Sequence, residues 1–483
     1  RTEDSGRKKR QRPEWVRTAW IVVGLIFAVT YGLRPLWKGS GADGKGSRPL
    51  ISISTEPEAK PAAAALPEAQ QLVGQARELI YDPDSARNEF ALAENLLKRA
   101  TDLAPTAGAA WGASALLNHY FYSRSYDQDR QRLVRSQAEA EKALRLDPRN
   151  TDALLALGLH RQVLGERARA QDYLDRALAA DPQNFKAILA QSKQLPGHPA
   201  AAKYLLAAAE HISRPAELFY YAAVELGWSW RFAEARVACE RAIAAQPFWR
   251  TYVQRAVIEE TLTADPAGMT RWLDKVPELK RDEPRVATMR YEAAMLQRDG
   301  AAAVRALTGL AADYLEDNYF TGPKAFLLAQ AYELAGQPGP AAEQWQLAER
   351  TVREKLTVDP GGSWRAMLAV SLAGQHRLVE AKALADACAA DDRLKKDTLA
   401  LEDVADAYIR LGEPARAIAL LRTIPAAPVH AGGVFAATLA AQPQWDGLRG
   451  QPGYAQLLEE LKHAEIPDPA NPPPTGAAAN PSK

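Results

Sequence analysis

The chain has 483 residues, of which 47% are hydrophobic and 25% are charged, and its formal net charge is +1. This composition can bury a large core, either in about two to four ordinary domains or in one long repeat array. The near-zero charge gives no chain-wide basic field, which counts against nucleic-acid binding, and the two cysteines form neither a disulfide framework nor the usual four-ligand zinc site.

The first predicted element is a membrane anchor. Residues 18–33 carry no charge, and Arg17 and Arg34 on either side can extend their charged ends towards water. We therefore predict a basic cytoplasmic segment at 1–17 and a transmembrane helix at 18–37. Four aromatic residues lie near the two ends of this span, where an interfacial belt would place them: Trp15, Trp20, Tyr31 and Trp37.

The alternative for this apolar stretch is a cleaved signal peptide, which would be shorter and followed by a small-residue cleavage site. Here Arg34, Pro35 and Lys38 come before the first candidate site, so we favour an uncleaved single span. Seven basic residues precede the span and four follow it within a similar distance. The positive-inside rule then places the N-terminus in the cytoplasm and the bulk of the chain in the periplasm or otherwise outside the cytoplasm, anchored in the inner membrane.

Two segments have the composition of unstructured chain. Residues 38–67 are rich in Gly, Ser, Pro and Ala without periodicity, which is typical of a flexible linker. Residues 465–483, with the sequence "EIPDPANPPPTGAAANPSK", are predicted to be a disordered tail.

The body of the chain, 68–464, has a helical hydrophobic pattern with almost no strand signal. Apolar residues recur at i, i+3, i+4 and i+7, and short breaks at Gly or Pro interrupt them. Pro148, Pro182, Pro215 and Pro247 follow one another at spacings of 34, 33 and 32 residues. This period predicts an all-α array of repeated helix pairs.

The unit at 151–184 resembles a tetratricopeptide repeat (TPR), a helix–turn–helix of about 34 residues. Gly158 and Ala170 are small enough for the two helices to approach closely, while Leu174 and Ala177 would seal the contact with the next unit. The same frame fits the units that begin near 216, 325, 364 and 401, and weaker pairs fill 68–105, 106–148, 183–215 and 250–320. The resemblance implies an all-α TPR α-solenoid of antiparallel helix pairs, preceded by a single transmembrane helix.

A second resemblance lies at 441–461, "AQPQWDGLRGQPGYAQLLEEL". This segment is similar to the closing segment of bacterial transmembrane signalling proteins, in which a winged-helix, kinase or cyclase domain precedes the membrane span. An open array needs its last apolar face covered, so we expect a C-terminal cap here. The first residue is Arg1 rather than Met, so we expect either a removed leader or a preceding domain, which could be catalytic.

No catalytic pattern is present in the sequence. The seven histidines are scattered without metal spacing, and no Walker A, GxSxG, GxGxxG or kinase-type motif occurs. Cys239 and Cys388 fall on helix-packing positions, where a small buried residue is the common case. We therefore predict that this chain is not an enzyme and has no catalytic residue, cofactor or metal site.

The resemblance implies that the first helix of each unit lines a concave face that binds a protein or peptide partner. In the aromatic stretch "FYYAAVELGWSW", Phe219 and Leu226 fall on packing positions, whereas Trp230 occupies an inter-helix turn where Gly is common. The last unit presents Glu402 and Asp406 on the same face. The predicted partner-binding residues are Leu155, Leu159, Val163, Tyr220, Val224 and Trp228.

Two functions follow from these predictions. The first is a membrane-anchored interaction module, which would be the sensory part of a bacterial signalling protein. The second is a scaffold for assembly of the envelope or of a secretion apparatus. The identity of the partner, the oligomeric state and any occupation of the groove by the chain itself are open at this point.

Overall fold

The computed structural model describes residues 62–465, except 125, 128, 317–319, 395–396 and 425–433. The expected basic segment 1–17, the transmembrane helix 18–37 with Trp15, Trp20, Tyr31 and Trp37, most of the linker 38–67 and nearly all of the tail 465–483 lie outside these residues. Among the described residues, none of the helices is both long and apolar enough to cross a membrane.

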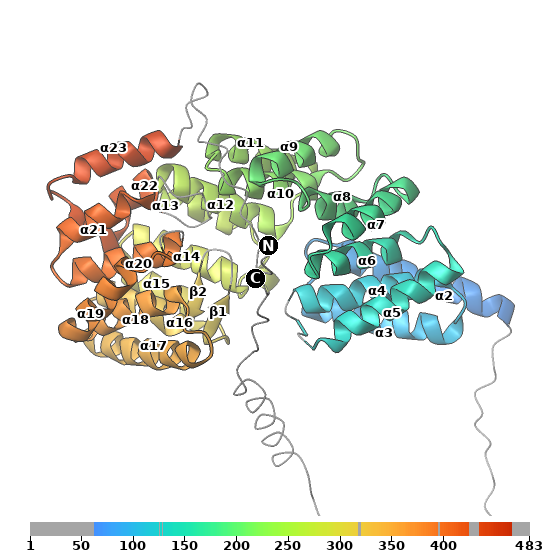
Figure 1. Cartoon of the computed structure of the whole chain (residues 1–483), viewed down its shortest axis with the longest axis horizontal. Coiled ribbons are helices and arrows are strands. Elements are labelled where there is room, and N and C mark those ends of the chain that lie inside the picture. The colour runs from blue at the N-terminus through green and yellow to red at the C-terminus, as the bar shows by residue number, and fades with distance from the viewer. Residues whose placement is uncertain are drawn as a thin grey trace, which may run out of the picture. The chain divides into compact units, whose positions relative to one another are not determined.

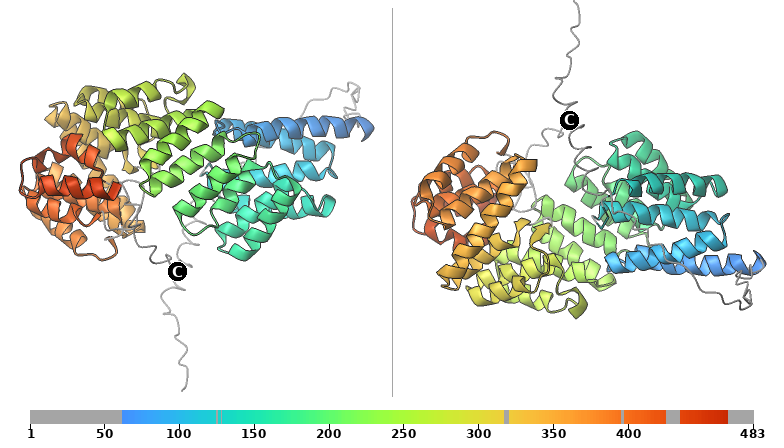
Figure 2. Two further views of the ribbon diagram at one scale, coloured as in Figure 1. Left: turned by 90° about the horizontal axis from the view of Figure 1, so that it is seen from above. Right: turned by 90° about the horizontal axis from the view of Figure 1, so that it is seen from below.

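The described chain is a series of antiparallel helix pairs (Figures 1 and 2). The first five pairs are α2 (Ala62–Tyr81) and α3 (Arg87–Leu103), α4 (Gly108–Ser123) and α5 (Gln131–Leu146), α6 (Thr151–Val163) and α7 (Arg167–Ala180), α8 (Phe185–Ser192) and α9 (His198–Ala209), and α10 (Ala216–Trp228) and α11 (Phe232–Ala245). Helix α2 begins six residues before the expected boundary at 68, because four alanines, strong helix formers, open it.

The pairing continues to residue 421. The next pairs are α12 (Trp249–Thr263) and α13 (Pro266–Leu273), α14 (Pro284–Leu296) and α15 (Gly300–Thr308), α16 (Lys324–Leu334) and α17 (Pro338–Val358), α18 (Gly362–Gly374) and α19 (Leu378–Ala389), and α20 (Thr398–Arg410) and α21 (Pro414–Leu421). A short 3-10 helix, η1 (Glu278–Lys280), and an antiparallel hairpin of β1 (Tyr314–Glu316) and β2 (Thr321–Pro323) interrupt the series. The all-α helix-pair solenoid that the repeat frame predicted is therefore the fold of the described residues.

The packing within a pair follows the repeat frame. Ala170, Leu174 and Ala177 are fully buried. A Cβ atom on Gly158 would lie 2.8 Å from Cδ2 of Leu174, which is closer than real contacts allow. Glycine at this position therefore lets α6 and α7 approach each other, as the spacing predicted.

The turn inside six of the described pairs uses a left-handed residue just after the first helix. Gly165, Gly336 and Gly412 occupy this position with φ between 66° and 74°. Trp230, Arg298 and His376 occupy the equivalent position with φ of 58°, although a side chain there costs about 1–2 kcal/mol. Contacts with the C-terminal segment explain two of these three exceptions, Trp230 and Arg298.

The C-terminal segment consists of α22 (Ala436–Ala441), η4 (Pro443–Leu448) and α23 (Tyr454–Glu465). Trp445, Leu448 and Leu457 are buried in the hydrophobic cluster that holds the cores of α20 and α21, so this segment covers the end of the array. Helix α22 also contacts α12, far back in the sequence. The segment therefore both covers the last pair and returns to an earlier one.

Candidate binding cavity on the inner side of the array

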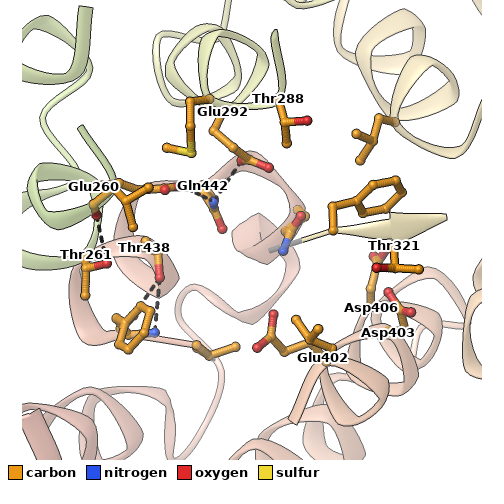
Figure 3. Close-up of a pocket in the computed structure, with 18 of the residues that line it drawn as sticks. Glu260, Thr261, Thr288, Glu292, Thr321, Glu402, Asp403, Asp406, Thr438 and Gln442 are labelled. Atoms are coloured by element: carbon orange, nitrogen blue, oxygen red, sulfur yellow. Dashed lines mark hydrogen bonds between the residues drawn. The ribbon is translucent and has the colours of Figure 1, made fainter. Parts of the chain in front are cut away.

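A cavity of about 410 Å³ lies among the first helices of successive pairs, from α10 to α20 (Figure 3). All of these first helices contribute residues to one wall, so they face the same side of the array. Residues 434–445 form another part of its wall, through Val434, Phe435, Thr438, Gln442 and Trp445. We call this space the inner cavity. Its volume falls within the range of about 300–1,000 Å³ that is usual for small-ligand sites.

Two of the predicted partner-binding residues line the inner cavity, namely Val224 and Trp228 on α10. The indole of Trp228 stacks on the imidazole of His198, with ring centroids 5.6 Å apart and an interplanar angle of 13°. Nδ1 of His198 lies 2.6 Å from Oε2 of Glu225. These contacts fix the position of the indole in the wall of the cavity.

The other four predicted residues lie elsewhere. Leu155 and Tyr220 are 0% and 4% exposed, so they belong to the core and offer little surface to a partner. Leu159 is half-buried against the N-terminal core cluster, and Val163 is exposed at the end of α6. The frame places Leu155 and Tyr220 on the inner side, but neighbouring helices cover that side here. A partner contact by these four residues stays a prediction.

Trp230, the departure from glycine in the aromatic stretch, contacts the returning C-terminal segment. Its ring lies 5.4 Å from that of Phe435, and the ring of Phe232 lies 5.1 Å from the same phenylalanine. Both pairs have the edge-to-face geometry that adds about 0.5–1.5 kcal/mol to the burial of the rings. Trp230 is only 6% exposed. The unfavourable turn conformation is therefore offset by docking of residues 434–435.

Arg298 holds the same segment at a second point. Its guanidinium donates two hydrogen bonds to the carboxylate of Asp446, at 2.7 and 2.8 Å. This bidentate pair raises the pKa of Arg298 and lowers the pKa of Asp446. Two turn positions of the array, in the α10–α11 and α14–α15 pairs, thus carry side chains that fasten the C-terminal segment across the inner side.

The inner cavity is strongly acidic. Its wall contains carboxyl groups from α12 (Glu260), α14 (Glu292) and α20 (Glu402, Asp403, Asp406), seen on several sides of the space in Figure 3. Nε2 of Gln442 donates to Oε1 of Glu260 at 3.5 Å and to Oε2 of Glu292 at 3.2 Å. Asp406 accepts from Nε of Arg410 at 3.1 and 3.2 Å. The frame predicted Glu402 and Asp406 on this face.

Burial raises the pKa of Glu260, Glu402 and Asp403 well above the usual range of carboxylic acids, and neighbouring acids raise it further. Sequence reasoning missed Glu260 and Glu292, because residues 250–320 fit the repeat frame poorly. Acidic residues on the first helices of these units were the signal that could have identified them.

Burial also raises the pKa of the two thiols, that of Cys239 to about 12 and that of Cys388 to about 11. Both cysteines are buried, at the packing positions where the frame put them. Among the described residues, no three His, Cys, Asp or Glu side chains are grouped so that they could hold a metal ion.

No family model and no curated protein matches the sequence. Among solved structures, the chain is similar to a tetratricopeptide repeat protein from Parabacteroides merdae, at 15% identity over 50% of this chain and 91% of that chain, with a TM-score of 0.31. It is also similar to PilF of Pseudomonas aeruginosa (16% identity, 53% and 94% covered, TM-score 0.32) and to yeast Tom70 (15%, 84% and 95%, 0.29). These similarities do not identify what this chain binds.

Proposed function

We propose that residues 62–465 form an interaction module and that a short segment of a protein or peptide partner enters the inner cavity. The observation that carries this proposal is the position of Val224 and Trp228. These two predicted contact residues lie in the wall of a cavity of about 410 Å³, next to further aromatic side chains. Apolar walls with a few polar groups are typical of binding sites.

The returning C-terminal segment limits what can enter. Because Phe435, Gln442 and Trp445 occupy part of the inner side, the space does not suit a long helix laid along the whole groove. It suits one or two residues of a partner, or a chain end. This narrows the sequence-based expectation of a helix or an extended peptide in an open groove.

Affinity capture with the full chain tests this function. We expect Trp228→Ala to lose the captured partner, because it removes the aromatic wall that stacks on His198. Trp111→Ala is the matched control, since Trp111 is also half-buried but lies on α4, outside the cavity wall. Circular dichroism checks that both variants fold. A partner that both variants retain equally would contradict the proposal.

The cellular setting is part of the same proposal. With an anchor at 18–37 and a cytoplasmic N-terminus, the module would present the inner cavity outside the cytoplasm. It would serve there as the sensory part of a bacterial signalling protein or, alternatively, as an envelope or secretion scaffold. A reporter that is active only in the cytoplasm, fused at Lys483, should be silent. Copurification of envelope assembly components would favour the scaffold.

A further inference from the structure

Among the residues that the structure describes, the wall of the inner cavity has acidic groups and no basic group. The acidic lining residues are Glu260, Glu292, Asp397, Glu402, Asp403 and Asp406, and the described part of the wall contains no Lys, Arg or His. Asp406 forms an ion pair with Arg410, which lies just outside the wall. Such a set of buried acids can ionise only at a high cost unless a positive charge accompanies it.

Glu402 is the clearest sign of a missing partner. Its Oε1 atom is fully buried and accepts no hydrogen bond from the described residues. In Figure 3 its carboxyl group extends from α20 into the cavity. A buried acceptor without a donor costs about 1–3 kcal/mol, so a ligand that donates here would recover that cost.

The rest of the wall suits an apolar stem rather than a bare ion. Trp228, Phe326, Trp364 and Phe435 place aromatic rings around the same space. Aromatic faces attract organic cations, and they also cover hydrocarbon. A hydrated metal ion would need oxygen ligands that converge on one point, and no such group of side chains is found within the described residues.

From these contacts we propose that the inner cavity binds an organic cation, an ammonium or guanidinium group on an apolar stem, with Glu402 as its main hydrogen-bond acceptor. This part of the inference rests on the proposed function: the source of the cation is a Lys or Arg side chain of the partner. A free amine has the same chemistry. A bound cation would oppose the effect of burial, which raises the pKa of Glu260 and of Glu402, and would favour the charged forms of both groups.

Calorimetric titration of the full chain tests the inference. The probes are n-butylammonium, n-butylguanidinium, neutral n-pentanol and a blocked pentapeptide with a central lysine. We expect saturable binding of the cations at least ten times tighter than that of pentanol. Binding at neutral pH should release protons, seen as a dependence of the heat on the buffer, because the acids ionise when the cation enters.

Two variants make the result specific. Glu402→Gln should weaken binding of the cations at least tenfold and leave pentanol unchanged. Glu139→Gln is the matched control, because Glu139 is also half-buried with its pKa raised by burial, but it lies on α5 and accepts a hydrogen bond from Asn118. It should bind as the parent does.

The outcomes separate the possible sources. Tighter binding of the pentapeptide than of butylammonium assigns the cation to a partner chain, and the reverse order assigns it to a free amine. Equal binding of pentanol and the cations, or full binding by Glu402→Gln, would overturn the inference. If the cations fail but capture still depends on Trp228, the proposed interaction function stands without a cationic ligand.

Discussion

The inner side of the array, which is the side that the first helices of the pairs face, differs between the two ends of the array. The repeat frame is the same at both ends. Between α2 and α8, one connected set of polar groups on this side is paired. The hydroxyl of Tyr81 donates to Asp152 at 2.7 Å and accepts from Asn184 at 3.1 Å, and Nε of Arg77 lies 3.2 Å from Asp152. Between α10 and α20, a buried oxygen of Glu402 has no donor among the described residues.

This difference shows what fills the inner side in each region. In the N-terminal region, the end of α2 lies against α6 and α8, and Nζ of Lys186 lies 5.5 Å from the ring centre of Tyr81. In the C-terminal region, residues 434–445 close the side without filling it, and they bring no basic group. In the first region packed side chains fill the inner side, whereas in the second region the inner side encloses the inner cavity.

The largest expected effect comes from removing a large buried side chain from the wall of the inner cavity. Trp445 is 1% exposed and joins the cap to the inner cavity. Trp445→Ala should lower the free energy of unfolding by about 3–5 kcal/mol, through lost burial and the hole it leaves. Urea denaturation measures this change. Leu461 is also fully buried in the cap, so Leu461→Ala is the control. It should lower the free energy of unfolding and leave cation binding unchanged.

The next prediction concerns the sign of the change in the free energy of unfolding when a polar group is removed from the wall of the inner cavity. Glu402→Gln should raise the free energy of unfolding by about 1–3 kcal/mol at pH 8, because it removes a charge from a buried acceptor that has no donor among the described residues. Lower stability of this variant at pH 8 would mean that Glu402 is paired after all.

The pH dependence of this effect has a definite sign. The pKa of Glu402 is raised in the folded chain, so the folded state holds the proton more tightly than the unfolded state. Its contribution to stability is full below the unfolded pKa of about 4.3 and is lost as the pH rises towards the folded value. The advantage of Glu402→Gln should therefore vanish near pH 4, which urea midpoints from pH 4 to 8 would show.

Removing a polar group from the N-terminal region should instead lower the free energy of unfolding. Tyr81→Phe removes the hydroxyl that bridges Asp152 and Asn184, and it should cost about 1–2 kcal/mol. Tyr173→Phe, at a half-buried tyrosine on α7, should stay within about 0.5 kcal/mol of the parent. If urea denaturation shows no change in the free energy of unfolding for Tyr81→Phe, the contrast between the two regions does not hold.

The smallest expected effect tests the turn at Trp230. Trp230→Ala and Trp230→Gly both lose the contact with Phe435, but only glycine relieves the positive φ. We expect the glycine variant to be the more stable of the two by about 1 kcal/mol in urea denaturation. Equal stabilities would show that the turn conformation costs little at this position.

The sequence alone determined the repeating part of this protein. Its 34-residue period, the small residues at Gly158 and Ala170 and the buried positions of Leu174 and Ala177 are local features, since each concerns one helix pair and its neighbour. The same frame identified Trp230 as a departure from glycine, and it placed Glu402 and Trp228 on the inner side.

Only the tertiary structure decided which part of the inner side is filled. Tyr81 meets Asp152 across 71 positions, Gln442 meets Glu260 across 182, and Arg298 meets Asp446 across 148. Such contacts depend on the angles between successive pairs, which add up along the array and leave no period in the sequence. The cavity, its acidic wall and its closure by the C-terminal segment arise from that accumulated geometry.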